Sequence, residues 1–171
     1  MNFDFADREK DFLSQLTSML EDFARDRDLE SGDLETLRGN LDAALGVLAP
    51  LGYLKIGLSQ PDPPLAGTLA LMAAMECLAV VSPSLFLAVE MSTRLFGRAL
   101  ALGDAAPECK ALEKQLAAGE IVGAVALSET AMNVENDPLD TTGAREGDTV
   151  FVSGAKSYVV NGPVADWLAV A

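Results

Sequence analysis

The spacing of apolar residues changes once along this chain, near Gly119-Glu120, and the change separates helix-forming from strand-forming sequence. Upstream, apolar residues recur at intervals of three, four and seven positions, the period of an amphipathic helix. Downstream, short β-branched runs alternate with glycine-containing turns, as in short strands. This order predicts an α+β fold, with an all-α helical bundle over 1–119 and the beginning of an antiparallel β domain over 120–171.

The helical part is expected to hold two amphipathic helices followed by two apolar ones and a short one. Ser31 is expected to cap the second amphipathic helix. The apolar helices are apolar around most of their circumference, which predicts central positions in the bundle. The most apolar run, 65–81, is shorter than the roughly 20 residues that a bilayer span needs, so no membrane span is expected. The predicted helices carry Phe5 to Phe23 and Leu34 to Leu48 and cover 64–81, 84–102 and 106–118.

Two hairpins are expected in the strand-forming part. Gly147-Asp148 and Asn161-Gly162 are good tight-turn dipeptides because these residues tolerate positive φ. The last predicted strand has no closing turn, and an unpaired apolar edge is usually avoided. We therefore expect this β domain to be truncated, or completed by another chain. The predicted strands are 121–127, 150–154, 157–160 and 167–171.

Charge and composition exclude several functions. The net charge of −14 argues against a nucleic-acid binder, which needs a basic surface. The absence of histidine excludes a Ser-His-Asp or Cys-His mechanism within the chain and removes the commonest nitrogen ligand of zinc, so no metal site is expected. Catalysis would depend on carboxylates, hydroxyls or a cofactor. Two cysteines without a secretory signal predict a reduced, cytoplasmic protein.

Glu76 and Glu90 are unusual because they lie within the apolar helices. One interpretation is that each reaches an edge or pairs with an arginine, such as Arg94 four residues after Glu90. The alternative is that one of them lies beside a ligand pocket.

A gap-free series of motifs over 128–166 carries the strongest functional signal. Together with E-x-x-A-x-x-S-P-S-L at 76–85, it resembles the flavin-dependent acyl-CoA dehydrogenases. The resemblance implies a helical domain, a β domain and a C-terminal helical bundle, the last absent from this chain. The motif residues are Ser128-Glu129, Thr141, Gly147-Asp148, Gly154, Lys156, Tyr158, Asn161-Gly162 and Ala165-Asp166.

The resemblance implies an FAD-dependent α,β-dehydrogenation of an acyl-CoA or acyl-carrier thioester to the trans-2-enoyl thioester, in fatty acid metabolism. The catalytic base would be a glutamate beyond residue 171, so no catalytic residue is assigned here. The implied partners are an electron-transferring flavoprotein and other subunits, as a homodimer, a homotetramer or a hetero-oligomer with a paralogue.

Site residues follow from the resemblance position by position. Leu127 and Ser128 would contact the flavin ring, Tyr158 would lie against it, and Val160 stands where the family usually has a hydroxyl donor. Loop residues Asn133 and Val134 would lie at the pyrophosphate. The acyl pocket would be lined from the helix over 84–102, with candidates Leu87, Glu90 and Met91.

Two substitutions leave a second hypothesis open. Val160 lacks a donor, and Val134 replaces a serine in a loop that has also lost its glycines. The alternative is a non-catalytic or partner subunit of the same fold, with weakened or lost FAD binding. Relatives that use the flavin for oxygen chemistry are a further alternative.

Overall fold

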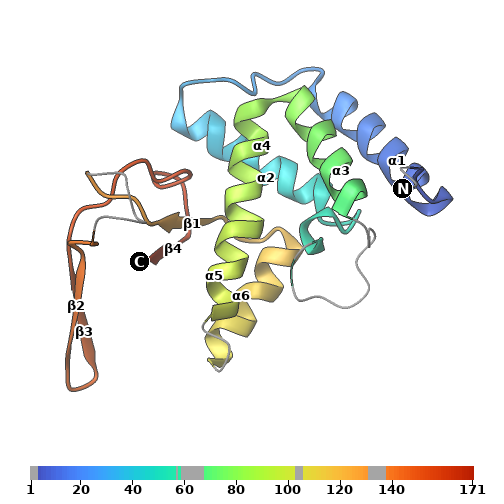
Figure 1. Cartoon of the computed structure of the whole chain (residues 1–171). Coiled ribbons are helices and arrows are strands. Elements are labelled where there is room, and N and C mark those ends of the chain that lie inside the picture. The colour runs from blue at the N-terminus through green and yellow to red at the C-terminus, as the bar shows by residue number, and fades with distance from the viewer. Residues whose placement is uncertain (1–3, 57, 59–67, 103–105, 131–137) are drawn as a thin grey trace.

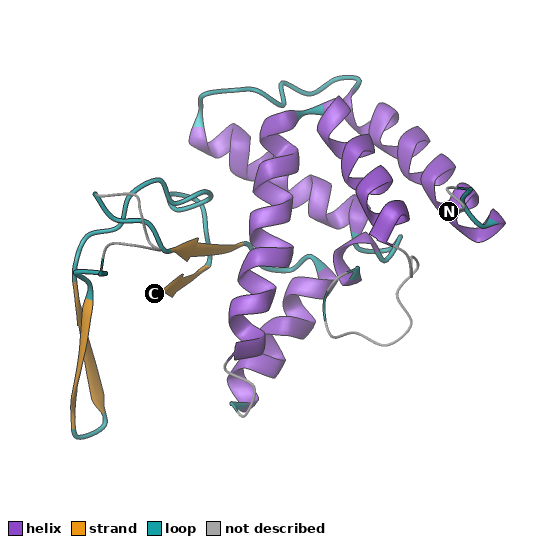
Figure 2. Ribbon diagram, in the orientation of Figure 1, coloured by secondary structure: helices purple, strands orange, loops and turns teal. Residues whose placement is uncertain are grey.

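Helices precede strands along the chain, as the change of periodicity predicts, and the strands gather on one side of the bundle (Figures 1 and 2). The computed structural model describes residues 4–56, 58, 68–102, 106–130 and 138–171. The predicted α+β class is confirmed. The helices are α1 (Asp7–Ala24), α2 (Leu34–Leu48), α3 (Thr68–Val81), α4 (Pro83–Glu90), α5 (Gly97–Leu102) and α6 (Pro107–Ala118). The strands are β1 (Gly123–Ala126), β2 (Thr142–Glu146), β3 (Thr149–Ser153) and β4 (Trp167–Val170).

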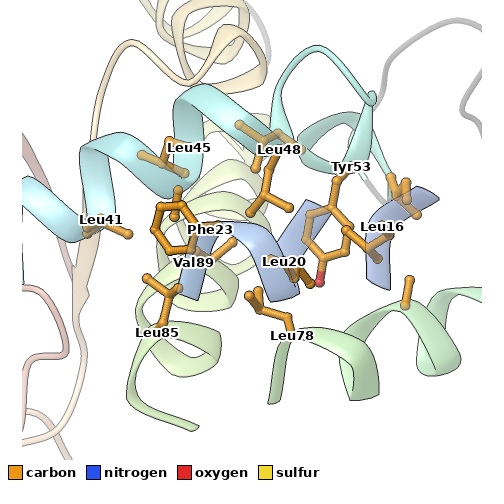
Figure 3. Close-up of a cluster of buried hydrophobic side chains, with 14 of the residues drawn as sticks. Leu16, Leu20, Phe23, Leu41, Leu45, Leu48, Tyr53, Leu78, Leu85 and Val89 are labelled. Atoms are coloured by element: carbon orange, nitrogen blue, oxygen red, sulfur yellow. The ribbon is translucent and has the colours of Figure 1, made fainter. Parts of the chain in front are cut away.

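The bundle core is built from one face of each long helix, joined by a short 3-10 helix, Tyr53–Lys55 (Figure 3). Most of each apolar stripe predicted for the first two helices is buried, whereas Leu34 at the start of α2 is 52% exposed. Each large apolar side chain taken out of water contributes roughly 1.5–3 kcal/mol, so this cluster stabilises the bundle. The fully buried side chains include Leu16 and Leu20 of α1, Leu45 and Leu48 of α2, Leu78 of α3, Val89 of α4 and Tyr53.

The cap of α2 is Asp33 and not Ser31. The Asp33 carboxylate accepts a hydrogen bond from Thr36 N at 2.8 Å, and this bond is the main reason that the pKa of Asp33 is lowered. Ser31 lies two residues earlier, where its hydroxyl accepts from Asp33 N at 3.2 Å. Asp and Ser are both good caps, so spacing alone does not decide between them.

The predicted central position is wrong for one face of α3. This helix packs between α1 and α4 (Figure 1), yet Met72 and Val80 point outward, and Val80 is 77% exposed. Glu76 is exposed on the same helix, as one interpretation predicts. An all-round apolar composition therefore overstates burial here. No helix within the described ranges is both long enough and apolar enough to cross a bilayer.

A π-helical turn, Met91–Phe96, joins α4 to α5 and packs against β1. Gly123 of β1 fits there because a Cβ atom at this position would lie 2.1 Å from the Phe96 ring. Its N–H donates to Ser92 Oγ at 2.9 Å. β1, which pairs with β4, is thus attached directly to the helices at the junction of α4 and α5.

The first predicted hairpin is confirmed and the second is wrong. β2 and β3 pair antiparallel around Gly147, which has φ +62°. Residues 157–160 form no strand, because Tyr158 and Asn161 adopt positive φ, and the turn at Asn161-Gly162 leads into β4. β4 then pairs parallel with β1 instead of folding back on 157–160.

Candidate functional site

The chain leaving β1 is fixed by a buried carboxylate. Glu129 accepts hydrogen bonds from Lys156 Nζ at 2.7 Å, from Asp140 N at 2.6 Å, and from Thr141 N and Oγ1 at 2.9 and 2.6 Å. Lys156 Nζ also donates to Leu127 O at 3.2 Å. The Lys156 bond, followed by those from Thr141 and Asp140, lowers the pKa of Glu129 to about 2. The Glu129 cluster (Glu129, Thr141 and Lys156) therefore ties the chain after β1 to the residues just before β2.

Ser128 and Tyr158 are brought to one place by the same cluster. Ser157 N donates to Ser128 O at 2.8 Å, so the segment carrying Tyr158 lies beside the end of β1. Tyr158 is 78% exposed and has φ +56°, an unusual conformation for a bulky side chain. Backbone strain of this kind is retained where the surroundings enforce it, often at ligand sites. With half-exposed Leu127 alongside, the arrangement offers an aromatic face and backbone polar groups to a flat ring.

The predicted flavin contacts are only partly covered by the structure. Asn133 and Val134 lie outside the described residues. Val160 is half-buried and its side chain carries no donor, so nothing replaces the hydroxyl expected there. Leu127, Ser128 and Tyr158 are the predicted ring contacts that the structure describes beside one another.

Two side chains anchor the turn that follows Val160. Asn161 Nδ2 donates to Ala88 O of α4 at 2.8 Å. Arg38 of α2 donates to Val164 O at 2.6 Å and to both carboxylate oxygens of Asp166, at 3.1 and 3.0 Å. These bonds fix the turn to two helices of the bundle.

Arg38 was missed by sequence reasoning. Asp166 falls on the family pattern, and its carboxylate also accepts from Val122 N at 2.8 Å. Its partner is 128 positions away and belongs to no motif. The sequence pointed to this contact only through Asp166 itself, a carboxylate that needs a cationic partner somewhere in the fold.

A cavity of about 250 Å³ lies between α2, α4 and this turn. It brings together Leu87 and Val160, two of the predicted site residues, whereas Glu90 and Met91 are not among its lining residues. Most of the lining is apolar. It includes Leu34, Leu37 and Leu41 of α2, Leu85, Leu87 and Ala88 of α4, and Val160, Pro163 and Val164 of the turn.

Glu90 faces the interior of the bundle. Its Oε1 accepts from Tyr53 Oη at 2.8 Å and from Arg94 Nη1 at 2.7 Å, which confirms the pairing with Arg94. Burial raises the pKa of Glu90 and outweighs the opposing effects of Arg94 and Tyr53. In this Glu90 cluster (Tyr53, Glu90 and Arg94), Glu90 Oε2 and the Nε and Nη2 atoms of Arg94 are buried and have no hydrogen-bond partner among the described residues.

No group of three or more His, Cys, Asp or Glu side chains in the described part of the chain is arranged to hold a metal ion. The candidate site consists of an aromatic and backbone surface at 127–128 and 158, the anchored turn, and an apolar cavity lined by that turn.

Comparison with known proteins reveals likeness at the level of structure. No protein-family model matches the sequence, and no curated protein matches it. A solved structure described as an FAD-dependent dehydrogenase is 26% identical, with a TM-score of 0.71, over 99% of this chain and 43% of that one. Butyryl-CoA dehydrogenase from Megasphaera elsdenii is 21% identical, with a TM-score of 0.76, over 99% and 45%.

A third match is a chain in a structure of the electron transferring flavoprotein of Acidaminococcus fermentans, studied for flavin-based electron bifurcation. It is 19% identical, with a TM-score of 0.77, over 99% of this chain and 44% of that one. The fold is thus one found among flavin-dependent dehydrogenases. More particularly, it is acyl-CoA dehydrogenase-like, and the chain spans less than half the length of each structure that it matches.

Proposed function

We propose that this chain forms the N-terminal helical domain (1–119) and the beginning of the β domain (120–171) of an FAD-dependent acyl thioester dehydrogenase. The observation that carries the proposal is the placement of Tyr158 beside Ser128, in a fold shared with FAD-dependent dehydrogenases. The Ser128 hydroxyl and the Leu127 backbone would hydrogen-bond the flavin ring, and the Tyr158 ring would lie against it.

The proposed reaction removes two hydrogens from an acyl thioester. The thioester carbonyl makes the α proton acidic enough for a carboxylate base, and the β hydrogen leaves as a hydride, which gives the trans-2-enoyl thioester. FAD, when bound, supplies the hydride acceptor. The residues described here would orient the ring, and no base is assigned among residues 1–171.

A non-catalytic or partner subunit is the second candidate. Val160 favours it, because this side chain lines an apolar cavity and donates no hydrogen bond toward a ring. An electron-transferring flavoprotein as acceptor, a homo-oligomer or a hetero-oligomer with a paralogue, a cytoplasmic location and a role in fatty acid metabolism complete the proposal.

The test of flavin binding is titration of the purified full-length protein with FAD, followed by flavin absorbance and fluorescence quenching. Binding is expected, and Tyr158→Leu is expected to weaken it because the stacking ring is removed. Phe151→Leu is the matched control, since Phe151 is another exposed aromatic, on the β2–β3 hairpin. Absence of a flavin complex in the wild type would refute the enzyme proposal.

Addition of butyryl-CoA to the FAD complex separates the two candidates. A dehydrogenase bleaches the flavin absorbance as the ring is reduced, and enoyl-CoA appears in equal amount. A complex that binds FAD without bleaching with either short- or long-chain acyl-CoA would support the partner-subunit candidate.

A further inference from the structure

The described segment over 157–166, here named the 157–166 segment, is neither helix nor strand. Hydrogen bonds attach both of its ends to the residues around β1. Ser157 N donates to Ser128 O at 2.8 Å, and Asp166 N donates to Val122 O at 2.8 Å. Between these ends, two backbone hydrogen bonds close a tight turn within the segment itself. The conformation of the segment therefore depends strongly on the side chains that hold it.

Arg38 of α2 holds the C-terminal end of the 157–166 segment. Its Nη1 donates to Val164 O at 2.6 Å and to Asp166 Oδ1 at 3.1 Å, and its Nη2 donates to Asp166 Oδ2 at 3.0 Å. On its other edge, Arg38 Nε donates to the carboxylate of Asp42, at 2.8 and 2.9 Å. A planar guanidinium bonded on both edges has a fixed orientation, and its bonds to carboxylates are stronger than neutral ones. The position of α2 therefore determines where the segment ends.

Tyr158, near the other end of the segment, is in a conformation that needs such support. Its φ of +56° costs free energy for a bulky side chain, so the residue would relax to negative φ if the segment were free. Such a change of φ would redirect the chain that follows. Asn161, which donates to Ala88 O of α4, and Arg38 at the end of the segment oppose this change. Their bonds would break if the chain after Tyr158 took another direction.

We propose that Arg38 is a positioning residue for the flavin ring, because its bonds to Val164 and Asp166 hold Tyr158 in the conformation that presents its ring beside Ser128. The inference rests on the proposed function, since FAD is the group that would lie against this ring. Arg38 is itself bonded to protein atoms and acts on the flavin only through the 157–166 segment. The helical bundle would thus contribute to the affinity for FAD from α2.

The test measures FAD binding to the full-length protein by fluorescence. Arg38→Gln is expected to weaken binding about tenfold, as for the loss of one hydrogen bond to a charged group. At saturating FAD, the bound flavin should also fluoresce more strongly, because a tyrosine ring that is no longer held against it quenches it less. Arg38→Lys keeps the charge without the planar fork and should restore part of the affinity. Arg25→Gln is the matched control, because Arg25 is an exposed arginine that pairs with Asp22 at the end of α1.

A double-mutant cycle separates positioning from a general loss of stability. In the Tyr158→Leu background the ring is absent, so adding Arg38→Gln is expected to weaken FAD binding no further. The same loss with and without the ring would overturn the inference, as would unchanged binding in Arg38→Gln. Should Arg38→Gln fail to fold, Asp166→Asn repeats the test, because it removes the charge that pairs with Arg38 and keeps the size of the side chain.

Hydrogen exchange distinguishes a failure of this inference from a failure of the proposed function. It is measured without FAD on the amides over 157–164, which include the Ser157 N–H bonded to Ser128 O. Faster exchange in Arg38→Gln than in wild type and Arg25→Gln would support the positioning of Tyr158 by Arg38, even in a protein that binds no FAD. Unchanged exchange would overturn it.

Discussion

The helical and strand regions of this molecule differ in how each surrounds a buried glutamate. Glu90 lies inside the bundle, where burial raises its pKa. Its Oε2 and two nitrogens of Arg94 are buried and have no hydrogen-bond partner in the described part of the chain. Glu129 lies at the exit of β1, where hydrogen bonds from Lys156, Thr141 and Asp140 lower its pKa to about 2. The same side chain is destabilised as an anion in one region and stabilised in the other.

The difference follows from the number of donors that each region supplies. Four hydrogen bonds from protein donors surround the Glu129 carboxylate, two of them from backbone amides. Glu90 accepts two hydrogen bonds, both on one oxygen, from Tyr53 and Arg94. The strand region fixes its chain with polar contacts, and the bundle is held by apolar packing that tolerates one imperfect ion pair.

The largest effect is expected from breaking that ion pair. Arg94→Met leaves Glu90 buried and unpaired, which should destabilise the chain by about 3–5 kcal/mol in urea unfolding. The triple variant Tyr53→Phe, Glu90→Leu, Arg94→Met removes all the polar groups and is expected to be at least as stable as wild type. A loss under about 1 kcal/mol in Arg94→Met would show that Glu90 is already neutral or hydrated.

Truncation in the bundle core is expected to cost almost as much. Leu48 of α2 is fully buried in the bundle core, so Leu48→Ala leaves a cavity and should lose about 2–5 kcal/mol of stability. A lower denaturant midpoint with an unchanged m-value would establish this loss of stability. Met72→Ala on the outer face of α3 is the control and should stay close to wild type.

The two glutamates are expected to give opposite pH dependence. The usual pKa is 4.5. Folding raises the pKa of Glu90. Its contribution to the free energy of unfolding is therefore full below pH 4.5 and is lost as pH rises through the raised pKa. Folding lowers the pKa of Glu129. Its contribution to the free energy of unfolding is therefore present above pH 4.5 and is lost as pH falls from 4.5 toward about 2.

Urea midpoints measured from about pH 2 to about pH 8 compare wild type with Glu90→Gln and Glu129→Gln. Glu90→Gln should reduce the fall of the urea midpoint at higher pH. Glu129→Gln should reduce the fall of the urea midpoint at lower pH. Parallel curves for wild type and Glu90→Gln would mean that this carboxyl titrates normally inside the bundle.

The smallest effect is expected on the β2–β3 hairpin. Phe151 is 55% exposed in this chain, so Phe151→Ala should change its stability by no more than about 0.5 kcal/mol. Thermal unfolding of Phe151→Ala and Leu48→Ala, measured side by side, compares the hairpin with the bundle core. A loss comparable to that of Leu48→Ala would mean that the hairpin is packed against another surface.

Periodicity predicted most of the fold. The stripes of α1 and α2 and the Gly147 hairpin follow from local sequence, because each needs only neighbours within a few residues. The strand predicted at 157–160 failed because contacts of Asn161 with α4 and of the following segment with Arg38 outweigh the β propensity of Tyr158 and Val160. The parallel pairing of β1 with β4 is likewise a long-range choice that no local pattern contains.

The candidate site was predictable only where a motif covers it. Ser128, Glu129 and Lys156 fall on the pattern, and the structure places them together. The role of Arg38 and the α2 wall of the cavity depend on which surface the 160–166 segment meets. Helical spacing shows that Leu34, Leu37 and Leu41 share a face, and it does not say what lies opposite them.

The π-helical turn at Met91–Phe96 holds one residue more than a regular α-helical turn would. One residue removed there would restore a regular α-helix and leave α4 and α5 facing the same neighbours, because the wider turn alone takes up the extra residue. Phe96 would keep its place against β1, and Leu87 and Ala88 would keep theirs at the cavity. A single-residue gap at this turn in a relative is therefore compatible with the same two contact faces, whereas a gap within α4 or α5 would turn one face about 100° away from the other.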